Sequence, residues 1–244
     1  MTFAVIYSEV TAKDTLGPLS RGDPVMPSAT ALPGLERLLE VCRARAHPLK
    51  LEPPLGPGHR AEPRVAGQPM DPQLAALHAR TSYLWLHGEL SLFPTRHERR
   101  PDLHRTNAYW RTDWAPPFGE LVVFAKDDRL AYCYATVPGL ADARGVQPVV
   151  WVDVYEALYA LPVASSVDRF LATYARYLEV APSSFADSED LPPPRCFPWD
   201  AAAPIAADAP LLRRIAAGDF DFLLQASARA REWVAALPDA APGR

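Results

Sequence analysis

The polar stretch from residue 87 to residue 104 contains the side chains best suited to hold a metal ion. Its candidate ligands are His87, Glu89, His97, Glu98, Asp102 and His104. Imidazole and carboxylate groups bind zinc in many enzymes, but nine and then six residues separate the successive histidines, and these spacings match no helical or ribbon zinc motif. We therefore expect a solvated loop without a metal. A metal-dependent hydrolase or nuclease that uses His87, His97 and His104 stays as an alternative.

Nucleophilic and nucleotide chemistry have less support in the sequence. It contains no GxSxG nucleophile elbow and no GxGxxG or GxxxxGK[ST] phosphate loop. Cys42, Cys133 and Cys196 lie far apart, and Cys133 is placed in an expected strand, where a buried and unreactive thiol is typical. The first residues lack the pattern of a secretory signal. These features predict a cytoplasmic protein that needs no cofactor, and they favour binding over catalysis.

Arginines and aromatic residues lie together between residues 96 and 114. The arginine run ends beside Trp110 and Trp114, a combination that also occurs in proteins binding single-stranded nucleic acid. The chain as a whole carries a net charge of −4 at pH 7, which opposes binding to a phosphate backbone. We therefore interpret the arginines as a solvated loop and the tryptophans as the edge of a core, with contact to a partner as their functional alternative.

Acidic residues concentrate in the second half of the chain. Residues 115–200 include 12 acidic and six basic side chains. Asp127 and Asp128 are adjacent, which in a tight turn favours bonds to backbone amides over acid–base catalysis. An acidic face attracts a basic protein partner, although an ordinary solubilising surface has the same composition. Asp127, Asp128 and Asp142 are therefore candidate contacts for such a partner.

Prolines separate the expected helices and strands in the first half of the chain. An apolar run at Phe3–Tyr7 predicts an opening strand, and apolar residues at helical spacing predict a helix over 32–46 with Pro33 in its first turn. Seven prolines in 48–72 predict an irregular surface segment. Asp71 and Pro72 then have the pattern of a helix N-cap and first-turn proline. The polar residues of 90–109 predict an exposed loop.

The second half alternates short apolar strands with turns. Strands are expected over 121–125, 130–136 and 149–152, and the short connections leave no room for crossover helices, so the sheet should be antiparallel. The clearest helix follows at 163–178, with Ser165 and Asp168 at the spacing of a capping box. Helices over 211–217 and 220–237 complete the chain, the second with Asp219 as N-cap.

These elements predict an α+β fold. We expect a mixed, mostly antiparallel sheet of about six strands with helices packed on one side, plus a C-terminal helical tail. The expected organisation is an α+β domain over 1–180, a proline-rich acidic linker or strap over 181–204, and a helical segment over 205–244.

The order of elements from Trp110 to Glu179 resembles the SUKH superfamily, which includes a yeast cell-wall-synthesis regulator and many bacterial immunity proteins. The resemblance is carried by Trp114 and Gly119 before a strand, by the acidic turn at 126–128, by the aromatic strand with Tyr132 and Tyr134, by the strand 148–153, and by the helix 163–171. The Pro-x-x-Tyr-x-x-Phe-Leu helix of the family is only loosely echoed near 74–86, and the last 40 residues have no counterpart.

This resemblance implies an α+β fold, no enzymatic activity and binding to another protein. Many members resemble immunity proteins that neutralise a cognate toxin, often a basic nuclease. We therefore predict a non-catalytic protein-binding domain of immunity type, with Trp110, Trp114, Asp127, Asp128 and Asp142 as contact candidates. A structural module that dimerises through its C-terminal helices is a further alternative. Fold analogy alone does not identify the partner.

Overall fold

A seven-stranded antiparallel sheet forms the centre of the molecule in the computed structural model, which describes residues 31–56, 62–128, 130–155, 158–180 and 196–241. Its strands, in spatial order, are β1 (Leu49–Glu52), β4 (Tyr83–Leu86), β5 (Leu90–Leu92), β6 (Val122–Asp127), β7 (Cys133–Thr136), β8 (Val149–Asp153) and β9 (Tyr159–Ala164). β2 (Arg64–Val65) and β3 (Gln68–Pro69) form a separate two-stranded ribbon. The predicted α+β fold and antiparallel pairing are confirmed, whereas the strand expected at Phe3–Tyr7 lies outside the described residues.

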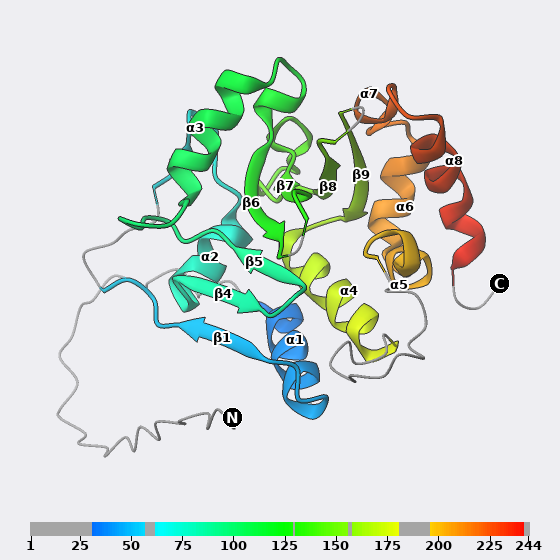
Figure 1. The fold of residues 1–244 in the computed structure, drawn as a ribbon. Coiled ribbons are helices and arrows are strands. Elements are labelled where there is room, and N and C mark those ends of the chain that lie inside the picture. The colour runs from blue at the N-terminus through cyan, green and yellow to red at the C-terminus, as the bar shows by residue number, and fades with distance from the viewer. Residues whose placement is uncertain (1–30, 57–61, 129, 156–157, 181–195, 242–244) are drawn as a thin grey trace, which may run out of the picture.

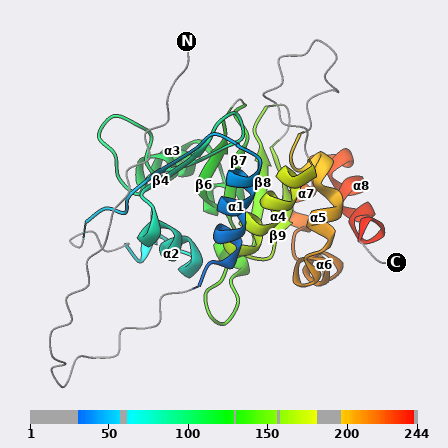
Figure 2. The ribbon, with the colours of Figure 1, turned by 90° about the horizontal axis from the view of Figure 1, so that it is seen from below.

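The helices are distributed around this sheet (Figures 1 and 2). They are α1 (Pro33–Ala44), α2 (Pro72–Arg80), α3 (Leu103–Asp113), α4 (Val167–Val180), α5 (Ala202–Ala206), α6 (Ala209–Ala216), α7 (Asp221–Leu224) and α8 (Ala228–Ala236). Short 3-10 turns occur at η1 (Phe118–Glu120), η2 (Pro138–Leu140), η3 (Trp199–Ala201) and η4 (Leu237–Ala240). Within the described ranges, no helix has both the length and the apolar character required to cross a membrane.

Helix α4 provides the main packing surface behind the sheet. Phe170 meets Phe124 of β6 and Tyr134 of β7, with ring centroids 5.9 and 5.0 Å apart. On its other side α4 packs closely on α1, where the Gly34 amide donates to Asp168 Oδ1 at 2.7 Å. A Cβ atom at Gly34 would lie 2.0 Å from the Asp168 carbonyl oxygen, so only glycine permits this approach.

The start of α4 differs from the expected capping box by one residue. The Ser166 hydroxyl accepts from the Arg169 amide at 3.2 Å, whereas Ser165 donates from its hydroxyl and its amide to the Asp208 carboxylate at 2.9 and 2.7 Å. The prediction that Ser165 caps this helix was therefore wrong. The reason is that α4 begins at Val167, which places Ser166 at the N-cap, while the side chain of Ser165 is already bonded to Asp208.

Two predicted loops contain regular structure instead. Residues 90–109 were expected to be an exposed loop, but they include β5 and most of α3, which begins at its N-cap Asp102. The proline-rich segment 48–72 was expected to be irregular, yet Leu49–Glu52 pairs with β4 as the outer strand of the sheet. Both elements are short and stabilised by residues distant in sequence, a contribution that local patterns do not reveal.

The C-terminal helices continue the core of the domain. Trp199 lies 6.2 Å from Trp151 of β8 and 5.7 Å from Trp233 of α8, measured between ring centroids. Ile205, Leu211 and Leu237 are buried. Of the expected linker, residues 181–195 lie outside the described ranges, while 199–206 is helical. The single helix expected over 220–237 is divided into α7 and α8, and Ser227 caps the second one.

Candidate protein-binding surface

One face of the sheet is partly exposed over β1, β4 and the end of β6, while Ser91 of β5 on the same face is buried. Lys50 pairs with Trp85, Trp85 with Ser91, and Ser91 with Lys126, so these four residues form one row across four strands. Directly opposite residues share a face of the sheet. Lys50 and Lys126 are exposed and Trp85 is half-buried. We call the surface formed by Lys50, Glu52, Tyr83, Trp85, His87, Arg100 and Lys126 the open face.

A chain of polar contacts fixes one end of the open face. The Tyr83 hydroxyl lies 3.2 Å from the Ser91 hydroxyl, and the Arg100 guanidinium stacks 4.9 Å from the centre of the Tyr83 ring. Glu52 bonds both Lys50 at 2.9 Å and Arg100 at 3.3 Å. The bond from Lys50 and the positive charges of Lys50 and Arg100 hold the pKa of Glu52 below its usual value. Charge-paired side chains of this kind keep the aromatic ring in one orientation.

Trp85 is held from the other end by an aspartate. Its indole Nε1 donates to Asp128 Oδ1 at 2.9 Å, and the other carboxylate oxygen of Asp128 accepts from the Gly88 amide, also at 2.9 Å. Gly88 has a φ of +69° in the β4–β5 turn, a conformation that glycine adopts most readily. His87 packs edge-on against the Trp85 ring, 4.9 Å between centroids. Trp85 therefore presents a fixed apolar surface to solvent.

The two tryptophans predicted from sequence lie elsewhere, beside η1. Trp110 is 8% exposed and donates from its indole nitrogen to the Phe118 carbonyl at 2.7 Å. Trp114 is half-buried, with its ring 5.9 Å from that of Trp110. This is the core-edge position that the sequence analysis gave as their structural role. With so little surface exposed, Trp110 has little area to offer a partner.

The three predicted aspartates are not brought together, and each one stabilises a turn. Asp127 accepts from the Leu130 amide at 2.8 Å. Asp142 accepts from the amides of Arg144 and Val146 at 2.8 and 2.9 Å, and it is ion-paired with the exposed Arg144 side chain. Asp128 alone contributes to the open face, through its bond to Trp85. The observed bonds of Asp127 and Asp128 therefore agree with their simpler interpretation as turn-forming residues.

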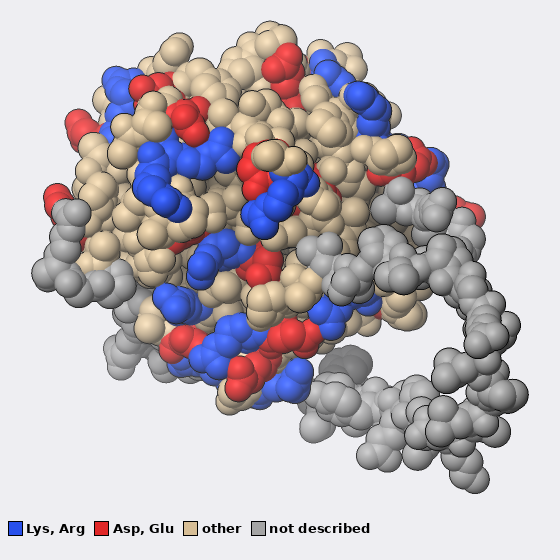
Figure 3. All heavy atoms as spheres, turned by 180° about the vertical axis from the view of Figure 1, so that it is seen from behind, with Lys and Arg blue, Asp and Glu red and all other residues tan. Residues whose placement is uncertain are grey.

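No acidic face gathers on the side of the molecule opposite to Figure 1. Figure 3 shows acidic groups beside basic ones there. Ion pairs elsewhere on the helices follow the same pattern, as between Arg37 and Glu40, 2.6 Å apart, and between Arg80 and Glu36. Exposed pairs of this kind contribute little to stability, but they cancel the field that would steer a basic partner.

The histidines of the polar stretch have separate partners. His87 lies on Trp85, His97 Nδ1 accepts from the amides of Arg99 and Arg100 at 3.1 and 3.0 Å, and His104 lies 3.7 Å from a Glu62 oxygen. Among the described residues, no group of three histidine, cysteine or acidic side chains is arranged to hold a metal ion. The geometry thus offers no shared ligand set for the hydrolase alternative.

The cysteine thiols are placed for packing rather than for nucleophilic attack. All three are free. Burial raises the pKa of Cys42 and of Cys133 to about 11 in each case, and it also raises the pKa of Cys196. Because the thiolate is the reactive form, these thiols are mostly protonated and unreactive at neutral pH.

Sequence reasoning missed the central residues of the open face. The helix that opens at Asp71 was given no definite end, and Tyr83 or Leu84 was considered as one of its inward residues. The sequence Tyr-Leu-Trp-Leu at 83–86 nevertheless alternates aromatic and apolar residues in the manner of a strand. Thr81 already has an extended backbone, with a φ of −149°. The alternation was the available signal, and the helical pattern of the preceding residues concealed it.

The architecture and this surface define an α+β protein in which half of a seven-stranded antiparallel sheet leaves one face open. Comparison of the chain with protein-family models, with curated proteins and with solved structures found no match. The open face and the order of elements in the sequence are therefore the observations that bear on function.

Proposed function

We propose that this chain is a non-catalytic protein-binding module and that the open face is its contact surface. The observation that supports this proposal is an ordered pair of aromatic residues, Tyr83 and Trp85, half-buried on a face that no helix of the described part of the chain covers. Tryptophan, tyrosine and arginine are the residue types enriched at the energetic centres of protein interfaces. Here Arg100 stacks on Tyr83 and completes that set.

The state of the aromatic rings favours a protein over a nucleic acid as the partner. Bases stack on the free faces of aromatic rings in a positively charged groove. On the open face, Arg100 already occupies one face of the Tyr83 ring, and Glu52 and Asp128 accompany the basic residues. The net charge of −4 opposes a phosphate backbone as well. Pre-positioned aromatic side chains lose little entropy on binding a protein surface.

The resemblance to the SUKH superfamily supports a more specific role, that of an immunity protein that neutralises a toxin. The charges on the open face predict a different kind of contact from the acidic one expected for such a protein. Lys50, Arg100 and Lys126 outnumber Glu52 and Asp128 on it. Binding would therefore depend on the Trp85 and Tyr83 side chains and on matched charge pairs, rather than on a uniformly acidic patch that attracts a basic nuclease.

Capture from native lysate with matched variants tests this proposal. The full chain should retain a specific protein, the Trp85→Ala variant should lose it, and Phe222→Ala should retain it. Phe222 is a suitable control because it is 37% exposed on α7, which Figure 1 places far from β4. Equal capture by all three proteins would contradict the proposal, and so would capture of RNA alone.

A further inference from the structure

Strand β1 is an edge strand of the sheet, next to β4. Half of its backbone N–H and C=O groups point away from the sheet. The Pro48 carbonyl accepts from the amide of His87, the residue opposite, at 3.0 Å. Hydrogen-bonded positions alternate along an antiparallel pair, so Lys50 also bonds toward β4. The intervening Leu49 and Leu51 therefore direct their N–H and C=O groups outward, and among the described strands none pairs with that edge.

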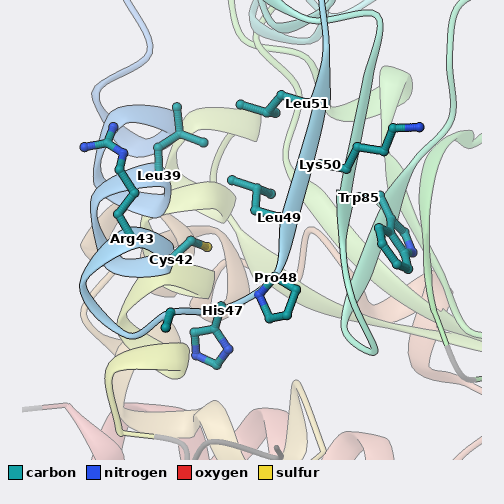
Figure 4. Close-up of a pocket in the computed structure, with 10 residues that line it drawn as sticks. Leu39, Cys42, Arg43, His47, Pro48, Leu49, Lys50, Leu51 and Trp85 are labelled. Carbon is teal, nitrogen blue, oxygen red and sulfur yellow. The ribbon is translucent and has the colours of Figure 1, made fainter. Parts of the chain in front are cut away.

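An apolar groove runs along this edge, between β1 and α1 (Figure 4). It encloses about 680 Å³ and is lined by Leu39 and Arg43 of α1 and by Leu49 and Leu51 of β1. In Figure 4 the two β1 leucines point toward the helix, whereas Lys50 points to the other side, toward Trp85. Leu51 is 42% exposed, which is unusual for a leucine placed on the apolar side of a strand.

We propose that a second copy of this chain pairs with β1 in antiparallel orientation, with the two Leu51 residues opposite each other on the two-fold axis. This pairing joins the two sheets edge to edge. In this register the Leu51 residues exchange two N–H···O bonds, and each Leu49 amide donates to the carbonyl of Pro53 in the other copy. The two Leu51 side chains meet above the groove.

The charges on the strand select this register. When Leu51 lies on the axis, Lys50 of each copy is directly opposite Glu52 of the other, at the non-hydrogen-bonded pair where side chains approach most closely. Lys50 and Glu52 are already paired within the chain at 2.9 Å, so the dimer forms an alternating network of four charges. Shifting the axis to Lys50 would preserve the number of backbone bonds but would place the two lysines opposite each other, which is unfavourable.

A lysine on an edge strand commonly prevents such pairing. Here the sequence Lys50-Leu51-Glu52 is charge-complementary to itself in antiparallel orientation, so the lysine favours one register instead of excluding all of them. Strand pairing alone buries little area compared with the roughly 1,600 Å² of a standard interface. The groove adds buried surface area, because Leu39 and Arg43 of both copies border the new strand pair.

Sedimentation of the purified full chain over a concentration series tests the dimer without any partner protein, so it is independent of the proposed function. We expect the mass to approach twice 26.8 kDa as concentration rises. Lys50→Glu should raise the dissociation constant roughly tenfold or more, since two like-charge contacts replace two attractive ones. The swap Lys50→Glu with Glu52→Lys should recover the dimer. Lys126→Glu, an exposed lysine of the same face but away from the edge, should have no effect.

These variants are compared in an Arg100→Gln background, because Arg100 bonds Glu52 and would repel a lysine there. Leu51→Asp provides a second disruptive variant, since it places two carboxylates on the axis, and circular dichroism verifies that each variant is folded. A wild-type chain that stays monomeric at its highest soluble concentration would overturn the proposal. So would a dimer that resists Lys50→Glu and Leu51→Asp, or a charge swap that fails to restore association.

Discussion

The two halves of the sheet use the same kinds of side chain in opposite ways. On β8, Val150, Trp151 and Val152 point alternately to the two faces, yet each is 0% exposed, so both faces are covered there. On β4, Leu84 and Leu86 are buried, while Tyr83 and Trp85 are half-buried on the open face. The covered half is enclosed on both faces, and the open half has an ordered surface available for recognition.

The local supports of the two strand tryptophans show the same difference. Trp151 is surrounded by the rings of Tyr132, Tyr159 and Trp199, with centroids 4.5 to 6.2 Å away. Trp85 is kept in place by one hydrogen bond to Asp128 and one edge contact with His87. A ring held by polar contacts at its edge leaves its apolar face available, whereas a ring enclosed by other rings serves packing.

The largest expected effect distinguishes these tryptophans directly. Trp151→Ala should lower the free energy of unfolding by about 3–5 kcal/mol, because it removes a fully buried ring from a packed cluster. Trp85→Ala should cost only about 1 kcal/mol, since the ring is partly exposed to solvent and loses one hydrogen bond. Urea denaturation of the two variants measures both values. Equal losses would show that the open half is as important for stability as the covered half.

Local patterns predicted the elements whose signals are contained within a single segment. The apolar stripe and Pro33 indicated α1, the Asp71 cap indicated α2, and the apolar runs of β6 and β8 indicated strands, all of which the structure contains. In α2 the cap is as expected, with Asp71 accepting from the amides of Gln73 and Leu74 at 2.7 and 2.9 Å. Such bonds lie within three residues of the cap and can be read from spacing.

The parts that were missed depend on pairing between distant residues. β1 lies among prolines and is stabilised by β4, more than 30 residues later. β9 was not predicted as a strand, and its last two residues were placed in the following helix, although it pairs with β8. The open face was missed for the same reason, because Lys50, Trp85 and Lys126 form a row only after four strands align. Strand register over such separations is set by tertiary contacts rather than by local sequence.

Acid should lower the free energy of unfolding through a buried histidine of α2. His78 of α2 is 6% exposed, and neither ring nitrogen has a hydrogen-bond partner among the described residues. Burial, and to a lesser degree the nearby His104, lowers the pKa of His78 from 6.5 to about 4. The unfolded chain therefore binds this proton more readily, so stability falls as pH decreases from about 6.5 to 4, by about 2–3 kcal/mol, and this contribution levels off below pH 4.

Urea denaturation between pH 7 and pH 4 measures this loss. His78→Leu should make the free energy of unfolding less dependent on pH in this range, whereas His87→Gln, a change of an exposed histidine, should leave that dependence unchanged.

Amide exchange at pH 5 compares the stability of the two halves directly, because α2 lies on the part of the molecule that carries β4 (Figures 1 and 2). We expect β4 and α2 to lose protection before β8 and β9. A simultaneous loss would mean that the halves unfold as one unit.

The smallest effect on stability concerns the aspartate that orients Trp85. Asp128→Ala removes two bonds of 2.9 Å, one from the Trp85 indole and one from the Gly88 amide, and should cost about 1 kcal/mol in urea denaturation. Its effect on recognition should be larger, because the freed ring must be reordered on binding. Asp142→Ala is the matched control, since Asp142 bonds only within its own exposed loop among the contacts described.

Fluorescence anisotropy and partner capture distinguish the two roles of Asp128. If it orients the ring, the Asp128→Ala variant should show faster motion of an exposed tryptophan and weaker capture of the partner, and Asp128→Asn, which keeps an oxygen for the indole N–H, should recover part of both. If Asp128 only stabilises the β4–β5 turn, the Ala and Asn variants should lose stability without a change in tryptophan motion. That second result would show that Asp128 is not what holds Trp85 in place on the open face.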